Sequence, residues 1–232
     1  LGMSDGWREI VNSFAWLNDL RAVGGPSARA LGKALVTRWL EENERYDAFS
    51  WRADILAARI RNILLNHSYL EVNSDALFRS QLLLSLSRQA EHLCRALPDG
   101  LAGAAHVKAI ISLMLAGLIL PRGEKWLAKG QALLGPTLAA QILADGGHVE
   151  RSPQVMLELL QHLIDLRDTF TLAGTKLPDG LSCNKCPEGC TTCNANKVCT
   201  ACSAGYYLNL ASCISCGVGC TACDQTAGTC TK

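Results

Sequence analysis

Cysteine is distributed very unevenly along this chain. Eleven of the twelve cysteines lie between Cys183 and Cys230, and only Cys94 precedes them. The spacing C-x2-C-x3-C-x2-C starts at Cys183 and starts again at Cys213. A segment of about 50 residues with few large apolar side chains cannot fold by burial alone, so it needs cross-links or a metal. The sequence therefore predicts two domains: a helical domain over residues 1–178 and a cysteine-rich repeat tail over residues 179–232.

Two chemistries suit the paired cysteines of the tail: disulfides in an oxidising compartment, or zinc held by four thiolates. The tail contains no histidine, and it has too many cysteines for one or two closed zinc sites. Disulfides are therefore favoured, and no metal or cofactor is expected. The predicted disulfide cysteines, whose connectivity the sequence does not reveal, are Cys183, Cys186, Cys190, Cys193, Cys199, Cys202, Cys213, Cys216, Cys220, Cys223 and Cys230.

The number of cysteines in the tail is odd. Overlaying the two repeats places Cys230 on Cys199, so the position equivalent to Cys202 falls just beyond Lys232. We therefore expect the tail to be cut before a twelfth cysteine, which leaves Cys230 or another tail thiol unpaired. At the other end, the chain begins at Leu1 without a visible signal peptide and is expected to start inside a longer protein. The tail favours an extracellular, periplasmic or cell-surface location.

Residues 1–178 repeat apolar side chains at helical spacing in about seven windows, separated by breaks rich in Gly, Pro, Asp or Asn. The first window carries apolar residues from Trp7 to Leu20, and the third runs from about Arg52 to Leu70. Asp75, in an Asn-Ser-Asp signal, and Ser152, which precedes a proline, are predicted helix caps. No window shows the alternation of a strand.

Seven helices of roughly 17 to 24 residues joined by short loops suit a bundle, a solenoid or an α/α toroid. The sequence has no fixed repeat of roughly 34 to 47 residues, which argues against a solenoid. We therefore predict a mainly α fold, an incomplete α/α toroid of about seven helices followed by a small disulfide-rich, loop-dominated tail.

Charge and hydropathy exclude two classes of partner. The net charge is +1, and basic residues are interspersed with acidic ones along the predicted helices, unlike the surface of a nucleic-acid-binding protein. The most apolar run, Ala109 to Leu120, is far shorter than the roughly 20 residues needed to cross a bilayer. The sequence therefore predicts a buried helix there, no transmembrane segment and no nucleic-acid partner.

Four segments together resemble the helical domain of heparinase II/III-like proteins. They are Asn12–Gly25, Ala34–Leu40, Leu115–Gly130 and Leu143–Leu160, in the same order as in that family. The resemblance covers residues 1–178 and implies the incomplete toroid of a polysaccharide lyase. It also implies an acidic polysaccharide as partner, β-elimination at a uronic acid, and a following β-sandwich domain that is missing here. The tail resembles furin-like or growth-factor-receptor cysteine-rich repeats.

The resemblance also locates a site. An Asn-His pair of the lyases falls on Ala105 and His106, and the Tyr and His of a second motif fall on Val155 and Met156. β-Elimination needs a base, an acid and a group that stabilises the enolate. Because the expected Asn and Tyr are absent, whether the chain is an enzyme stays open, and we expect no lyase turnover from it.

The remaining candidates each have a structural alternative. His106 and His148 are the candidate catalytic residues, and Glu150, Arg151 and Trp126 are the candidate substrate-binding residues. His148 and Glu150 equally suit a structural role in a glycine-rich loop before a capped helix, where Glu150 favours the helix dipole. Arg151 also suits a solvated surface, and a tryptophan at helical spacing also suits the core.

Three hypotheses follow. The first is a fragment resembling the polysaccharide-binding helical domain of a lyase, not active alone. The second is a non-enzymatic cell-surface interaction protein with a disulfide-rich stalk. The third is that the join near Leu181 is a product of gene assembly, so that the chain is a chimera.

Overall fold

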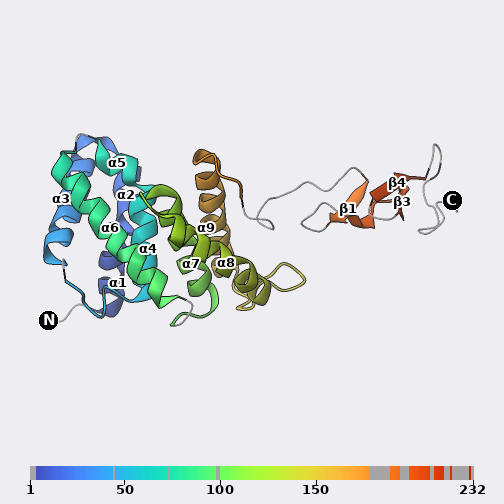
Figure 1. Cartoon of the computed structure of the whole chain (residues 1–232), viewed down its shortest axis with the longest axis horizontal. Coiled ribbons are helices and arrows are strands. Elements are labelled where there is room, and N and C mark those ends of the chain that lie inside the picture. Colours follow the sequence, from blue (N-terminus) through green and yellow to red (C-terminus); the bar gives the residue numbers. More distant parts are fainter. Residues whose placement is uncertain are drawn as a thin grey trace. The chain divides into compact units, whose positions relative to one another are not determined.

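The computed structural model describes residues 4–43, 45–72, 74–97, 100–177, 189–193, 199–209, 212–216, 220 and 230. Contacts between Cα atoms divide the chain into two compact units, Leu1–Lys176 and Leu177–Lys232. The named elements in the described part of the first unit are all helices (Figure 1). These are α1 (Asp5–Ser13), α2 (Trp16–Val23), α3 (Gly25–Glu42), α4 (Ala53–Leu65), α5 (His67–Glu71), α6 (Ala76–Ala96), α7 (Gly103–Ile119), α8 (Glu124–Gln141) and α9 (Pro153–Leu172).

The predicted mainly α class is confirmed, but two predicted helices are each split. Phe14 adopts a left-handed conformation with φ 59° and separates α1 from α2. Asn66, with φ −107° and ψ 10°, separates α4 from the short α5. About seven predicted helices therefore become nine within the described residues, while closure into a toroid stays a prediction.

The predicted caps begin the helices as expected. The Asp75 carboxylate accepts a hydrogen bond from the backbone N–H of Phe78 at 2.7 Å, at the start of α6. The Ser152 hydroxyl accepts one from the N–H of Val155 at 3.4 Å, at the start of α9. Each cap satisfies an N–H group that the first turn of a helix leaves without an intrahelical partner.

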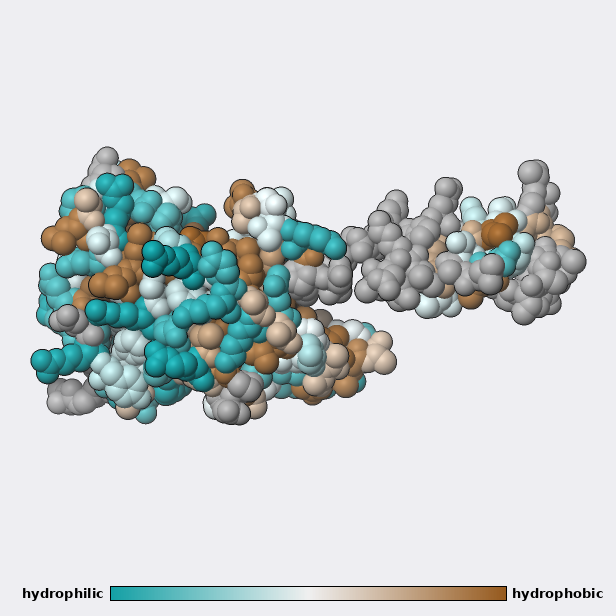
Figure 2. All heavy atoms as spheres, viewed as in Figure 1, coloured by the Kyte–Doolittle hydropathy of each residue, from teal (hydrophilic) through white to brown (hydrophobic). Residues whose placement is uncertain are grey.

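Helix α7 lies at the centre of the first unit and packs against α4, α6, α8 and α9 (Figure 1). Every residue from Ala109 to Ala116 is buried, which explains the apolar run in the sequence as a helix surrounded by other helices. No helix among the described residues is long and apolar enough to cross a bilayer. On the face shown in Figure 2, hydrophilic side chains are interspersed with hydrophobic ones.

Two glycines allow α7 and α8 to approach closely. A Cβ atom on Gly117 would lie 2.6 Å from the backbone nitrogen of Leu127, and one on Gly123 would lie 2.4 Å from the carbonyl oxygen of Gly117. Both distances are shorter than van der Waals contact, so neither position has room for a side chain. The segment Leu115–Gly130, which carries part of the family resemblance, is therefore a close helix–helix contact.

The described part of the second unit contains two antiparallel pairs of short strands. Strand β1 (Cys190–Cys193) pairs with β2 (Cys199–Cys202), and β3 (Tyr206–Asn209) pairs with β4 (Ser212–Ser215). Disulfides join Cys190 to Cys199, Cys202 to Cys213, and Cys220 to Cys230, with Cα–Cα distances of 5.9, 5.6 and 5.8 Å.

These bonds confirm the disulfide prediction for six cysteines, and Cys216 is disulfide-bonded as well. Cys230 is bonded to Cys220 and is therefore not the unpaired thiol, while an unpaired cysteine elsewhere in the tail stays a prediction. Cys183, Cys186 and Cys223 lie outside the described residues, as does the side chain of Cys193.

Candidate functional site

The loop before α9 is attached to the first turn of α7. The N-cap of α7 is Ala102, which has no side chain able to accept a hydrogen bond. Glu150 takes over this role, because its Oε1 accepts a hydrogen bond from the backbone N–H of Ala104 at 3.1 Å. A carboxylate at this position also interacts favourably with the positive end of the helix dipole.

His148 is buried and stabilises this loop through hydrogen bonds of both ring nitrogens. Only 2% of the residue is exposed. Its Nε2 lies 2.8 Å from Oε1 of Gln141, and its Nδ1 accepts a hydrogen bond from the backbone N–H of Glu150 at 3.2 Å. Because an amide oxygen only accepts, Nε2 donates the hydrogen bond to Gln141. Both ring nitrogens are engaged, so the structure favours the structural alternative for His148 over the catalytic one.

Arg151 belongs to the same loop as His148, and His106 belongs to α7. Arg151 forms an ion pair with Asp145 at 2.5 Å, which lowers the pKa of the Asp145 carboxyl. His106 lies in the first turn of α7, two residues beyond Ala104. Its Nε2 is buried without a hydrogen-bond partner among the described residues. The structure therefore brings His148 and Glu150 to the start of α7, which carries His106, whereas Arg151 pairs within its own loop.

Trp126 lies elsewhere. It belongs to α8, is 4% exposed, and donates a hydrogen bond from Nε1 to Oε2 of Glu91 on α6 at 3.1 Å. A buried indole has no free face on which a sugar ring can stack. The position favours the alternative that Trp126 is part of the core.

A second group of polar residues, not predicted from the sequence, joins α4, α7 and α9. Lys108 on α7 forms an ion pair with Glu158 on α9, and Arg61 on α4 forms one with Asp165 on α9. The contacts Ala104–Glu150 and Lys108–Glu158 advance in the same direction along both segments, so α7 and α9 run parallel. We call Arg61, Lys108, Glu158, His162 and Asp165 the inter-helix polar row.

His162 lies within this row. Its Nδ1–H donates a hydrogen bond to the carbonyl oxygen of Glu158 at 2.7 Å, which leaves Nε2 unprotonated in the neutral ring. Burial lowers the pKa of His162 to about 4, and the nearby charges of Arg61 and Lys108 act in the same direction. Glu158 and His162 are four residues apart on one helix face, which the sequence shows, but their charged neighbours come from other helices.

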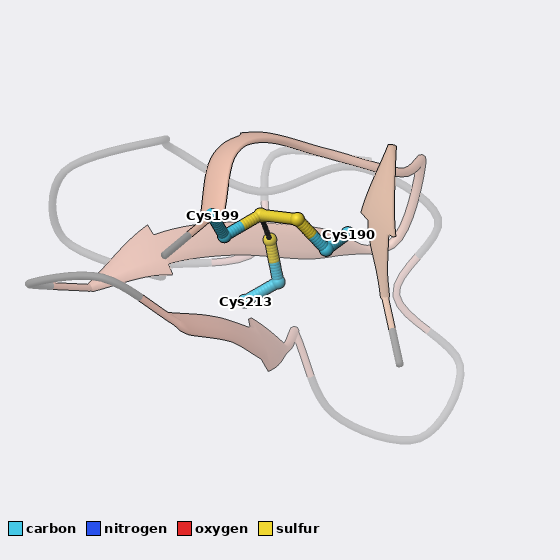
Figure 3. Close-up of side chains that lie close together, drawn as sticks. All are labelled: Cys190, Cys199 and Cys213. Atoms are coloured by element: carbon cyan, nitrogen blue, oxygen red, sulfur yellow. Dashed lines mark hydrogen bonds between the residues drawn. A yellow bond between two sulfur atoms is a disulfide. The ribbon is translucent and has the colours of Figure 1, made fainter. Parts of the chain in front are cut away.

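The tail holds a cluster of three sulfurs (Figure 3). The Sγ atoms of Cys190, Cys199 and Cys213 all lie within 4.8 Å of one another, and those of Cys199 and Cys213 are 3.0 Å apart. Each of these cysteines is in a disulfide. A metal would need thiolates, so the cluster is a pair of adjacent cross-links.

Comparison with known proteins identifies the helical unit. Residues 26–179, well over half of the chain, match the family described as heparinase II/III N-terminus. The chain belongs to the heparinase II/III N-terminal domain family. It is similar to FtsZ-localized protein C of Caulobacter vibrioides (strain NA1000 / CB15N), with 32% identity over 174 residues. The matched region is 74% of this chain and 30% of that protein, so the chain spans less than a third of the relative. No solved structure matches.

Within the heparinase II/III N-terminal domain, the two positions that lack the expected lyase side chains lie beside the loop of Glu150. Ala105 is in the first turn of α7, and Val155 is in the first turn of α9. Methyl and isopropyl groups neither transfer protons nor donate hydrogen bonds to an enolate. Of the inter-helix polar row, Lys108 lies on α7, Arg61 lies on α4, and the other three residues lie on α9.

Proposed function

We propose that the helical unit binds an acidic polysaccharide and does not cleave it. Membership of the heparinase II/III N-terminal domain family supports this assignment. The observation that carries it is the inter-helix polar row, in which Lys108 of α7 and Arg61 of α4 are each paired with a carboxylate of α9. A carboxylate or sulfate of the polymer replaces these carboxylates as the partner of the two cations.

The exposure of the two cations supports such an exchange. The side chains of Lys108 and Arg61 are 28% and 17% exposed, so each is reachable from solvent. Arginine pairs with a carboxylate through two parallel hydrogen bonds, and lysine acts as a point charge. Binding is therefore expected to weaken as ionic strength rises, because salt screens exposed charges.

The test compares two substitutions that break the same ion pair. Lys108→Gln removes the cation and is expected to weaken binding of alginate or heparan sulfate by about three- to tenfold. Glu158→Gln removes the competing carboxylate and is expected to strengthen it. Isothermal titration calorimetry on the full chain measures both, with neutral dextran as the control ligand. If both variants shift affinity in the same direction, the row acts only through structure and the proposal fails.

The absence of cleavage is tested separately. β-Elimination produces a 4,5-unsaturated uronide that absorbs ultraviolet light. Incubation of the full chain with alginate, heparan sulfate or chondroitin sulfate is expected to give no such absorbance, because Val155 and Ala105 replace the groups that the chemistry needs. A steady rise in absorbance that scales with protein concentration would overturn this part of the proposal.

A non-enzymatic interaction protein is the second candidate. It is favoured by the similarity to a relative that is named for its localisation with FtsZ, and by the tail, which short disulfide loops make a suitable spacer. The test is direct binding between the purified full chain and purified FtsZ of Caulobacter vibrioides. Saturable binding that persists after Lys108→Gln supports this candidate, and an absence of binding removes it.

A further inference from the structure

A cavity of about 360 Å³ lies on the helical unit, away from the first turn of α7. One wall is a face of α6, which contributes Gln81, Ser85 and Arg88 at spacings of four and three residues. The opposite side is formed by the end of α3 with Asn43, and by Trp51 just before α4. The volume lies within the range of small-molecule sites.

A buried cation without a counter-ion lies behind this cavity. Arg59 of α4 is 0% exposed and forms no ion pair among the described residues. Its Nε–H donates to Oε1 of Gln89 at 2.8 Å, and one Nη donates to the carbonyl oxygens of Asn12 and Ser50 at 2.9 and 3.0 Å. Its other Nη is buried without a hydrogen-bond partner among the described residues. The acceptors are neutral and the guanidinium lies over the Trp39 ring, 4.3 Å from its centroid, so no described carboxylate neutralises the positive charge.

Two short connections link Arg59 to the cavity wall. Gln89, which accepts from Arg59, donates from Nε2 to the Ser85 hydroxyl at 3.0 Å, and Ser85 lines the cavity. Ser50, whose carbonyl also accepts from Arg59, directly precedes Trp51. An uncompensated charge in a low-dielectric interior produces a potential that is screened less than one in water. The cavity therefore lies next to a fixed source of positive potential.

The lining adds charge, hydroxyl-binding groups and an aromatic ring. Arg88 is exposed and has no ion-pair partner among the described residues. Asn43, Gln81 and Glu41 offer side chains that hydrogen-bond to hydroxyl groups. Trp51 packs edge-on against His92, with ring centroids 5.2 Å apart. Among the described lining residues, Glu41 is the only carboxylate, so an anion binds on the side of Arg88.

We propose that this cavity binds a sugar acid, with Arg88 pairing with the carboxylate and Trp51 forming the apolar wall against the ring. The chemistry is that of a uronic acid, either free or as one unit of a polymer. The choice of a sugar acid rests on the proposed function, whereas the preference for a small hydroxy-anion rests on Arg59, Arg88 and the lining. Burial lowers the pKa of Arg59 to about 9, so its guanidinium remains charged at neutral pH.

The test follows the indole N–H of Trp51 by ¹H–¹⁵N NMR in the full chain, with the signal assigned by Trp51→Phe. Titration with galacturonate is expected to shift this signal and saturate. Galactose lacks the carboxylate and acetate lacks the ring, so each is expected to require at least about tenfold higher concentration. If galacturonate leaves the Trp51 signal unchanged, the cavity is not a site for sugar acids and the proposal fails.

Arg88→Gln is expected to weaken galacturonate binding by about tenfold or more. Arg79→Gln is the matched control, because Arg79 is exposed on the same helix and does not line the cavity; it is expected to bind as the unchanged chain does. Equal affinity in both variants would overturn the proposal.

A further titration with trigalacturonate distinguishes binding in the cavity from binding at the inter-helix polar row. If Arg88→Gln abolishes binding of the monosaccharide while Lys108→Gln weakens only the polymer, the two sites are independent and both proposals stand. If galacturonate fails to bind but the polymer responds to Lys108→Gln, the cavity proposal fails and the proposed function remains. If Lys108→Gln leaves polymer affinity unchanged but Arg88→Gln weakens galacturonate binding, the proposed function fails and the cavity proposal remains.

Discussion

The carboxylate of Glu150 accepts a hydrogen bond from the backbone N–H of Ala104 at 3.1 Å, which attaches the loop before α9 to the first turn of α7. Gly103, which directly precedes Ala104, leaves room for this carboxylate. Its φ is +56°, and a Cβ atom there would lie 2.6 Å from Oε1 of Glu150. The attachment therefore depends on a glycine as well as on the carboxylate.

We expect Gly103→Ala to destabilise the helical unit by about 1–3 kcal/mol, because alanine is strained at positive φ and displaces the cap. Urea unfolding followed by far-ultraviolet circular dichroism measures the change. Gly6→Ala on α1 is the control: a Cβ atom there meets nothing within 4 Å, so helix propensity should raise stability by about 0.5–1 kcal/mol. A neutral result for Gly103→Ala would show that the loop is not held in this way.

The second prediction concerns pH. The pKa of His162 is lowered to about 4 in the folded chain, so the folded state resists a proton that the unfolded chain accepts below about pH 6.5. The neutral ring of His162 therefore contributes to the free energy of unfolding above pH 6.5, and this contribution is lost as the pH falls towards 4. Between pH 6.5 and 5 the loss should be about 1–2 kcal/mol.

This loss should disappear in His162→Gln and persist in Gln161→Ala, an exposed neighbour on α9. Urea unfolding at a series of pH values between 6.5 and 5 keeps the carboxylates ionised and isolates the histidine. An unchanged pH dependence in His162→Gln would contradict the buried, neutral state of the ring.

Trp126→Phe tests the position of an indole that the sequence offered as a sugar platform. The change removes the hydrogen bond to Glu91, so we expect a loss of about 1 kcal/mol in the free energy of unfolding. Affinity for alginate should remain unchanged, because the ring is buried between helices. If Trp126→Phe lowered the affinity for alginate without lowering the free energy of unfolding, Trp126 would be a substrate-binding residue.

The tail is expected to yield specific cross-linked peptides. Proteolysis without reduction, followed by mass spectrometry, should recover Cys190 bonded to Cys199, Cys202 bonded to Cys213, and Cys220 bonded to Cys230. Alkylation of the denatured, unreduced chain should label Cys94, which is a free thiol, and leave these six unlabelled. Labelling of all six together with bound zinc would show a metal site in place of disulfides.

Local signals in the sequence predicted much of the helical unit. Caps such as Asp75 and Ser152 act on N–H groups three residues away, so the sequence contains all their partners. The break at Phe14 was missed because no glycine or proline marks it. The partners of His148 and Trp126 depend on how the loop and helices pack, and single-sequence periodicity does not specify that packing.

The inter-helix polar row shows the same limit at the candidate site. Arg61, Lys108 and Asp165 come from three helices, and each taken alone resembles an ordinary surface charge. The contacts that α4 and α7 make with α9 bring them around His162. The disulfide chemistry of the tail was predictable from composition, whereas the bond between Cys220 and Cys230 required the chain path.

The close contact at Gly117 and Gly123 has a consequence for how this domain diverges. Because backbone meets backbone there, the distance between α7 and α8 is set without any side chain that mutation can alter. The outward face of α8 is free to change its charge and size while α7 stays in register with α9. The spacing of these two helices is therefore expected to stay constant while the outward face of α8 varies, provided that these two positions remain glycine.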